Sequence, residues 1–74
     1  MNTHTLVQMA NQIARAFAAK AEPEAVAATV DHILQFWDPR MRHGIETLPD
    51  AAAAGLSPVA RAAVLRLAER EPVH

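Results

Sequence analysis

The sequence predicts an all-α fold, a small bundle of three to four short helices that forms a single domain over residues 1–74. Ala, the strongest helix former, makes up about a quarter of the chain. Apolar residues recur at intervals of three and four, while Gly and Pro fall between these periodic segments. The two ends, at about residues 1–4 and 71–74, are expected to be flexible.

The first helix is expected to run from about Leu6 to Lys20. Thr5 is its candidate N-cap, and Gln8, three residues later, would complete a capping box. The apolar stripe of this helix consists of Leu6, Met9, Ala10, Ile13 and Phe17.

The second helix is expected to begin at Glu22-Pro23, because Pro in the first turn gives up only an N–H that has no partner. It should end at Asp38-Pro39, since the residue before Pro is disfavoured in the α region. Its apolar stripe consists of Val26, Val30, Ile33 and Trp37.

Asp38 is expected to cap a third short helix that has Pro39 in its first position. Gly44 either weakens this helix or marks a close approach of another segment. The apolar face consists of Met41, Ile45 and Leu48.

The segment from Pro49 to Gly55 is expected to be a loop, and a helical turn at residues 50–54 remains open. Ser57-Pro58 is a strong start signal for a last helix that reaches about Arg70. The residues expected to face inward are Ala60, Val64, Leu67 and Ala68.

Size and charge favour a soluble cytoplasmic protein that has a partner. Chains below about 70–80 residues usually need disulfides, a metal or a partner for stability, and the absence of Cys excludes disulfides and thiolate metal sites. A net charge of −1 gives no overall field for nucleic acid or anionic lipid. Neither a secretion signal nor an apolar stretch of about 20 residues is present.

Independent catalysis is not expected, and we assign no catalytic, cofactor-binding or metal residue. The chain's one Ser, Ser57, already has a role as an N-cap, and two Gly residues cannot form a phosphate loop. The four His residues lack the spacing of a zinc site. Asp31 and His32 would point in different directions on a helix, so we expect His32 to be solvated or to lie at the edge of an interface.

The segment from His32 to Arg42 concentrates large side chains in a chain that is poor in aromatic residues. Because Trp and Arg are enriched at protein–protein hot spots, this segment predicts a docking surface, to which Met9 would also contribute. The candidate interface residues are Phe36, Trp37, Arg40, Met41 and Arg42. The competing interpretation places Trp37 in the core, leaves Phe36 balanced between core and interface, and pairs Arg42 loosely with Glu46.

Two other functions remain open. In one, Arg40, Arg42 and His43 at a helix start bind phosphate in a small nucleic-acid-binding or regulatory module, although the near-zero net charge and Glu46 argue against it. In the other, the chain is a free-standing helical protein without a lasting partner.

Three blocks of the sequence resemble the small delta subunit of the soluble, molybdenum-containing NAD-dependent formate dehydrogenases. They are Leu-Val-Gln-Met-Ala-Asn-Gln-Ile-Ala at 6–14, His-Ile-Leu-Gln-Phe-Trp-Asp-Pro-Arg-Met-Arg at 32–42, and Gly-Leu-Ser-Pro at 55–58. The resemblance implies a non-catalytic accessory subunit that contacts the large molybdenum-bearing catalytic subunit. It also implies a complex that holds a molybdopterin cofactor, iron–sulfur clusters and FMN, none of them bound by this chain.

Overall fold

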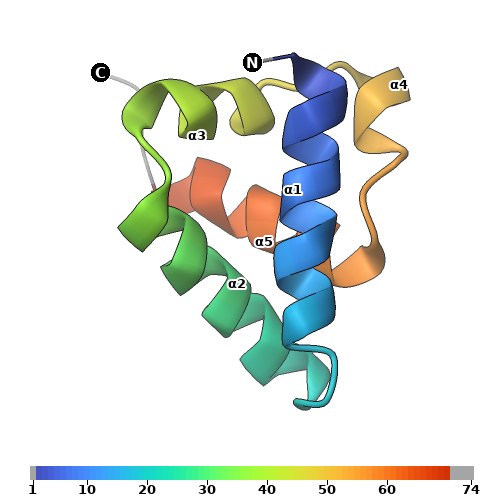
Figure 1. The fold of residues 1–74 in the computed structure, drawn as a ribbon, viewed down its shortest axis with the longest axis vertical. Coiled ribbons are helices and arrows are strands. Elements are labelled where there is room, and N and C mark those ends of the chain that lie inside the picture. Colours follow the sequence, from blue (N-terminus) through green and yellow to red (C-terminus); the bar gives the residue numbers. More distant parts are fainter. Residues whose placement is uncertain (1, 71–74) are drawn as a thin grey trace.

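The computed structural model describes residues 2–70 and confirms the all-α prediction (Figure 1). Over these residues it contains five helices and no strand: α1 (Thr3–Ala16), α2 (Glu22–Phe36), α3 (Pro39–Glu46), α4 (Asp50–Ala53) and α5 (Pro58–Arg70). The single turn α4 is the helical turn left open at residues 50–54. Residues 3 and 4 belong to α1, whereas residues 1 and 71–74 lie outside the described residues, so flexibility there stays a prediction.

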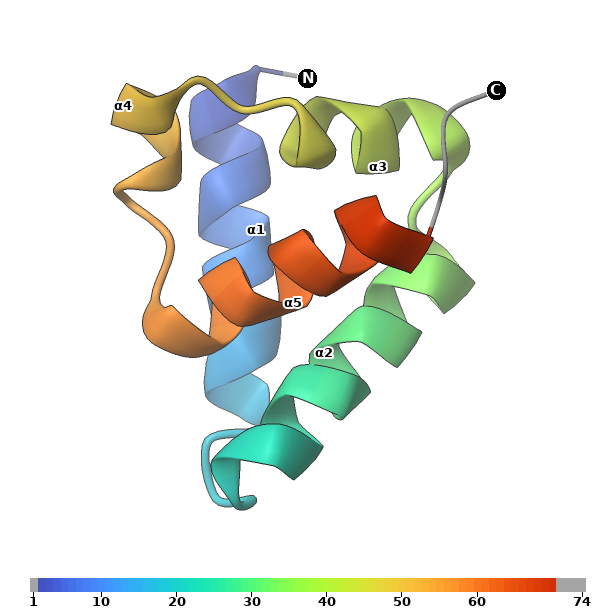
Figure 2. The ribbon, with the colours of Figure 1, turned by 180° about the vertical axis from the view of Figure 1, so that it is seen from behind.

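Helices α1 and α2 diverge from the turn that joins them, and α3 lies across the open end between them (Figure 1). Helix α5 crosses behind this frame and packs against α1, α2 and α3 (Figure 2). Helix α4 lies on the outer side of α1, with which it is in contact. The core therefore lies where α5 meets the other three long helices.

The core combines a few large aliphatic side chains with many Ala residues. Ile33, Ile45 and Leu67 are completely buried, and so are the small side chains of Ala10, Ala60 and Ala63. Because the separation of packed helices depends on the side chains at the contact, these Ala residues let α1 and α5 approach their neighbours closely.

The predicted limits of α1 were wrong at both ends. The helix begins at Thr3, and Oδ1 of Asn2, rather than the Thr5 hydroxyl, accepts the capping hydrogen bond, from the Thr5 N–H at 2.8 Å. Asn is a stronger N-cap than Thr, so the helix gains residues at its start. It ends at Ala16, since the N–H of Phe17 turns back to the carbonyl of Ala14.

The starts of α2, α3 and α5 agree with the prediction. Helix α2 begins at Glu22-Pro23. Oδ1 of Asp38 accepts from the Met41 N–H at 2.9 Å, and Oγ of Ser57 accepts from the Ala60 N–H at 3.3 Å.

The buried faces agree with the prediction for α2, where Val26, Val30, Ile33 and Trp37 are all buried. In α1 the buried face is shifted to Leu6, Val7, Ala10 and Ala14, because the α4–α5 segment covers Val7. In α5, Ala63 is buried, and Ala68, predicted to face inward, is exposed since it lies one residue past the face that ends at Leu67.

Asn11 connects the middle of α1 to the segment before α5. Its Nδ2 donates to the carbonyl of Gly55 at 2.9 Å, and its Oδ1 accepts from the Ser57 N–H at 2.8 Å. The sequence places Asn11 on the polar side of α1, and its two partners are 44 and 46 residues away, so no local pattern indicates these bonds.

We expect Asn11→Ala to lower the free energy of unfolding by about 1–2 kcal/mol, because two hydrogen bonds are lost and Ala recovers only part of this through helix propensity. The neighbouring Gln12 is exposed, and Gln12→Ala is the matched control. Urea denaturation of both variants measures the difference. Equal stability of the two variants would show that the Asn11 bonds contribute nothing.

Gly44 marks a close approach, one of the two interpretations that the sequence left open. A Cβ atom at this position would lie 2.8 Å from Cδ1 of Leu6, a buried residue of α1. The absence of a side chain therefore lets α3 settle directly on α1.

Gly44→Ala should therefore destabilise the chain, because overpacking costs about 1–3 kcal/mol and helix propensity returns only about 1 kcal/mol. In a Leu6→Val background, which lacks the Cδ1 atom, the same substitution should stabilise. A double-mutant cycle measured by urea denaturation tests this change of sign. A Gly44→Ala effect of the same sign in both backgrounds would contradict the close approach as its cause.

Candidate docking surface

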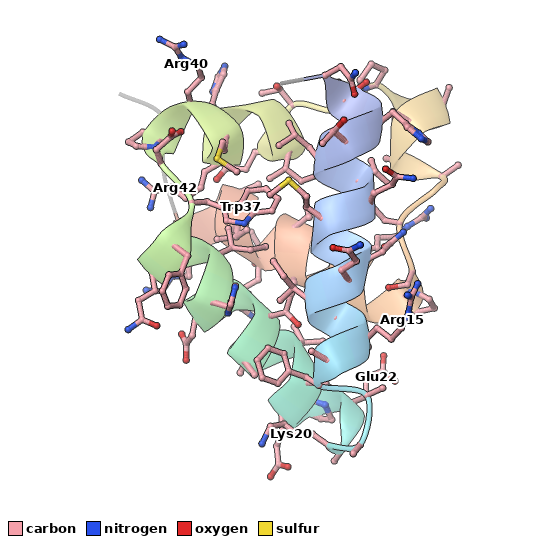
Figure 3. All side chains as sticks on the ribbon, in the orientation of Figure 1. Arg15, Lys20, Glu22, Trp37, Arg40 and Arg42 are labelled. Carbon is pink, nitrogen blue, oxygen red and sulfur yellow. The ribbon has the colours of Figure 1, made fainter. Side chains whose placement is uncertain are left out.

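Phe36 and Trp37 are neighbours in sequence but have opposite surroundings. Trp37 is 6% exposed and belongs to the core, whereas Phe36 is 68% exposed. The backbone of Trp37 is extended, with φ −92° and ψ 139°, as the chain leaves α2. This turn directs the indole inward among α1, α2 and α3 (Figure 3). Trp37 thus has little surface to offer a partner, and its assignment to the interface stays a prediction.

The two Arg residues of α3 project from different sides of the helix (Figure 3). They are two residues apart, a spacing at which helical side chains do not face each other. Arg40 is exposed and points away from the body of the molecule. Arg42 is half-buried, and its Nε atom is shielded from solvent, as is Oε2 of Glu46 one turn later. Of the pair, Arg40 is the side chain that is open to a partner.

This geometry weakens the nucleic-acid alternative. Arg40 and His43 are exposed and lie three residues apart, a spacing that places them on one side of a helix. Arg42 projects from another side of α3 (Figure 3). The three candidate residues therefore do not form one surface that could follow a phosphate backbone.

Three rings form a row between the end of α1 and the end of α2. The His32 ring lies 4.7 Å from that of Phe36, tilted by 40°, and 6.5 Å from that of Phe17, edge-on at 66°. Phe17 and His32 are half-buried, so exposure increases towards Phe36. We call these three residues the aromatic row.

The aromatic row was not predicted as a unit from the sequence. Phe17 was expected in the apolar stripe of α1, and His32 was expected to be solvated or to lie at the edge of an interface. The four-residue spacing of His32 and Phe36 is a signal for their contact, but the approach of Phe17 depends on how α1 packs on α2.

Met9 and Met41 lie half-buried against the core. Both remain partly accessible, and Met is adaptable at binding surfaces because its side chain is unbranched and polarizable. They fit the margin of a docking surface, and the exposed candidates are Phe36 and Arg40.

The described residues provide little for chemistry of their own. Over residues 2–70, no group of three or more His, Asp or Glu side chains is placed to hold a metal ion. Within the same range, no helix has the length and apolar character to cross a membrane. What the arrangement does offer is an exposed aromatic side chain, Phe36, at the end of α2 and an exposed Arg, Arg40, at the start of α3. Both aromatic residues and Arg are common in protein-binding surfaces.

Two clefts open on other parts of the surface. One, of about 460 Å³, lies between the end of α1 and the starts of α2 and α5. The other, of about 380 Å³, lies between the first half of α1 and α4. Asn11 and Gly55 line both clefts, so the hydrogen bond between them separates the two.

A family model described as the NADH-dependent formate dehydrogenase delta subunit (FdsD) matches residues 5–64. This range covers most of α1, all of α2, α3 and α4, and the first half of α5. No curated protein and no solved structure shows significant similarity to the chain.

Proposed function

The chain belongs to the NADH-dependent formate dehydrogenase delta subunit family, and on this premise we propose that it is a non-catalytic accessory subunit of a cytoplasmic formate dehydrogenase complex. It docks on the large molybdenum-bearing catalytic subunit and supports the assembly or the stability of the complex. The family match, which spans 60 of the 74 residues, supports a role within such a complex.

The observation that favours docking is the exposure of both Phe36, at the end of α2, and Arg40, at the start of α3. Covering a Phe side chain that is otherwise exposed contributes about 1.5–3 kcal/mol, and a guanidinium can bind a carboxylate through two parallel hydrogen bonds. The helix break at Asp38-Pro39 lies between the two residues and places the start of α3 beside the end of α2. Phe36 is also steadied by its ring contact with His32, which lowers the entropy lost when it is covered.

The metal-ligating residue types of this chain agree with a subunit that holds none of the redox cofactors of the complex. Iron–sulfur clusters are held chiefly by Cys thiolates, and this chain has no Cys. The molybdopterin cofactor, the iron–sulfur clusters and the FMN of the complex would be held by other subunits. This chain would contribute protein contacts.

We expect Phe36→Ala and Arg40→Ala each to weaken binding to the complex by at least tenfold without changing helicity, because both side chains are exposed. The matched controls are Leu65→Ala, which removes another exposed apolar side chain (61% exposed), and Arg66→Ala, which removes another exposed Arg. Biolayer interferometry against the purified complex lacking this subunit measures the affinities, and circular dichroism checks the fold. If only the two control variants bind more weakly, the interface lies on α5 and not at Phe36 and Arg40.

Deleting the gene should lower formate-driven NAD reduction while sparing NADH-driven reduction of an artificial dye. The reason is that the first activity needs the molybdenum subunit, the proposed contact, whereas the second needs only the flavin-bearing part of the complex. Both activities are measured on the same purified complex. Equal loss of both would indicate general misassembly and contradict a specific contact with the molybdenum subunit, and full formate turnover would show that this subunit is dispensable.

A further inference from the structure

The larger cleft combines an apolar floor with a charged rim. Its floor includes the buried Ala14 and Ala25 and the half-buried Val59. Arg15, Lys20 and Glu22 stand at the rim, and all three are exposed (Figure 3). No residue of the aromatic row and none of the five predicted interface residues lines it. The cleft is therefore separate from the docking surface proposed above.

The charges at the rim favour an acidic ligand. Two cations, Arg15 and Lys20, and one anion, Glu22, line the cleft. The start of α5 also lines the cleft, and the first turn of α5 has no acidic residue to offset the positive end of the helix dipole. The start of α2 adds little, because Glu22 and Glu24 lie in its own first turn.

The cleft is held open by bonds within the fold. Asn11, Gly55 and Ser57 line it, and the two hydrogen bonds of Asn11 fix the start of α5 relative to α1. A site fixed before the ligand arrives loses less conformational entropy on binding. Its volume of about 460 Å³ lies within the range of about 300–1,000 Å³ that is usual for ligand sites.

We propose that this cleft binds an acidic peptide segment of another subunit of the complex, with acidic side chains paired with Arg15 and Lys20 at the rim and an apolar side chain on the Ala14–Ala25 floor. The proposal rests on the accessory-subunit function above and adds a second contact to it. A free small carboxylate is the weaker candidate, because exposed ion pairs contribute little by themselves. A peptide adds the burial of an apolar side chain on the floor of the cleft.

The first test measures the binding of charge variants to the purified complex that lacks this subunit. The double variant Arg15→Ala/Lys20→Ala should bind at least tenfold more weakly, with a flatter dependence on salt concentration. Glu22→Gln should bind more tightly, a gain that partial unfolding cannot produce. The control Arg66→Ala/Arg70→Ala removes two exposed Arg residues that do not line the cleft and should leave the affinity unchanged.

The outcomes separate the two proposals. If the unaltered chain does not bind the complex, the accessory-subunit function is wrong. If the unaltered chain binds and the charge variants bind equally well, only the proposal for the cleft is overturned.

A cross-link identifies the occupant. Because the chain has no Cys, Ala18→Cys places a single thiol at an exposed position of the cleft, and Leu65→Cys is the control outside it. A thiol-linked photo-cross-linker at position 18 should capture a segment of another subunit that is rich in Asp or Glu, identified by mass spectrometry. Capture of a second copy of this chain, of a segment without acidic residues, or of no segment would overturn the proposal.

Discussion

The packing of α5 against the other three long helices is the constraint on which the rest of the structure depends. Helices α1 and α2 diverge and α3 bridges their open end, so this frame has no interior until α5 crosses it (Figure 2). The buried face of α5 consists of Ala60, Ala63, Val64 and Leu67. The two Ala residues allow close approach, and Leu67, completely buried, supplies the volume. Leu67 lies beyond the matched family range, which ends at residue 64, so the core includes a residue that the match does not cover.

A local backbone change at the end of α2 creates the exposed aromatic side chain. If the helix continued through Trp37, Phe36 and Trp37 would differ only by the rotation of one helical residue. Instead Asp38-Pro39 stops the helix and the backbone of Trp37 becomes extended, so the indole fills the core while Phe36 remains at the surface against His32. The signal that ends α2 also begins α3, since Asp38 caps it, so Phe36 at the end of one helix and Arg40 at the start of the next are only four residues apart in sequence. The dipeptide Asp38-Pro39 thus determines both the exposure of Phe36 and the start of the helix that carries Arg40.

The parts of the fold that sequence could predict are those set by neighbouring residues. Pro39 and Pro58, with their capping partners Asp38 and Ser57, act over three or four residues, and the starts of α3 and α5 follow from them. The start of α1 was missed because Asn2, which lies within one turn of the predicted cap Thr5, is the stronger N-cap and begins the helix earlier. The role of Asn11, the contact of Phe17 with His32 and the charged cleft could not be predicted, because each depends on segments brought together only by helix packing. For the same reason, periodicity grouped Trp37 with the buried stripe of α2 but could not decide how exposed Phe36 would be.

The two proposed contacts lie at opposite ends of α2. Phe36 is its last residue, and Glu22, at the rim of the cleft, is its first. A helix of 15 residues is about 22 Å long, so the two contacts would be separated by roughly that distance. One contact alone would hold the subunit but leave it free to rotate about the point of attachment, whereas two contacts joined by a stiff helix fix its orientation as well. Once either end is bound, the other end meets its partner at a high effective concentration. Two modest contacts on a domain of only 74 residues would then hold it more firmly than either contact alone.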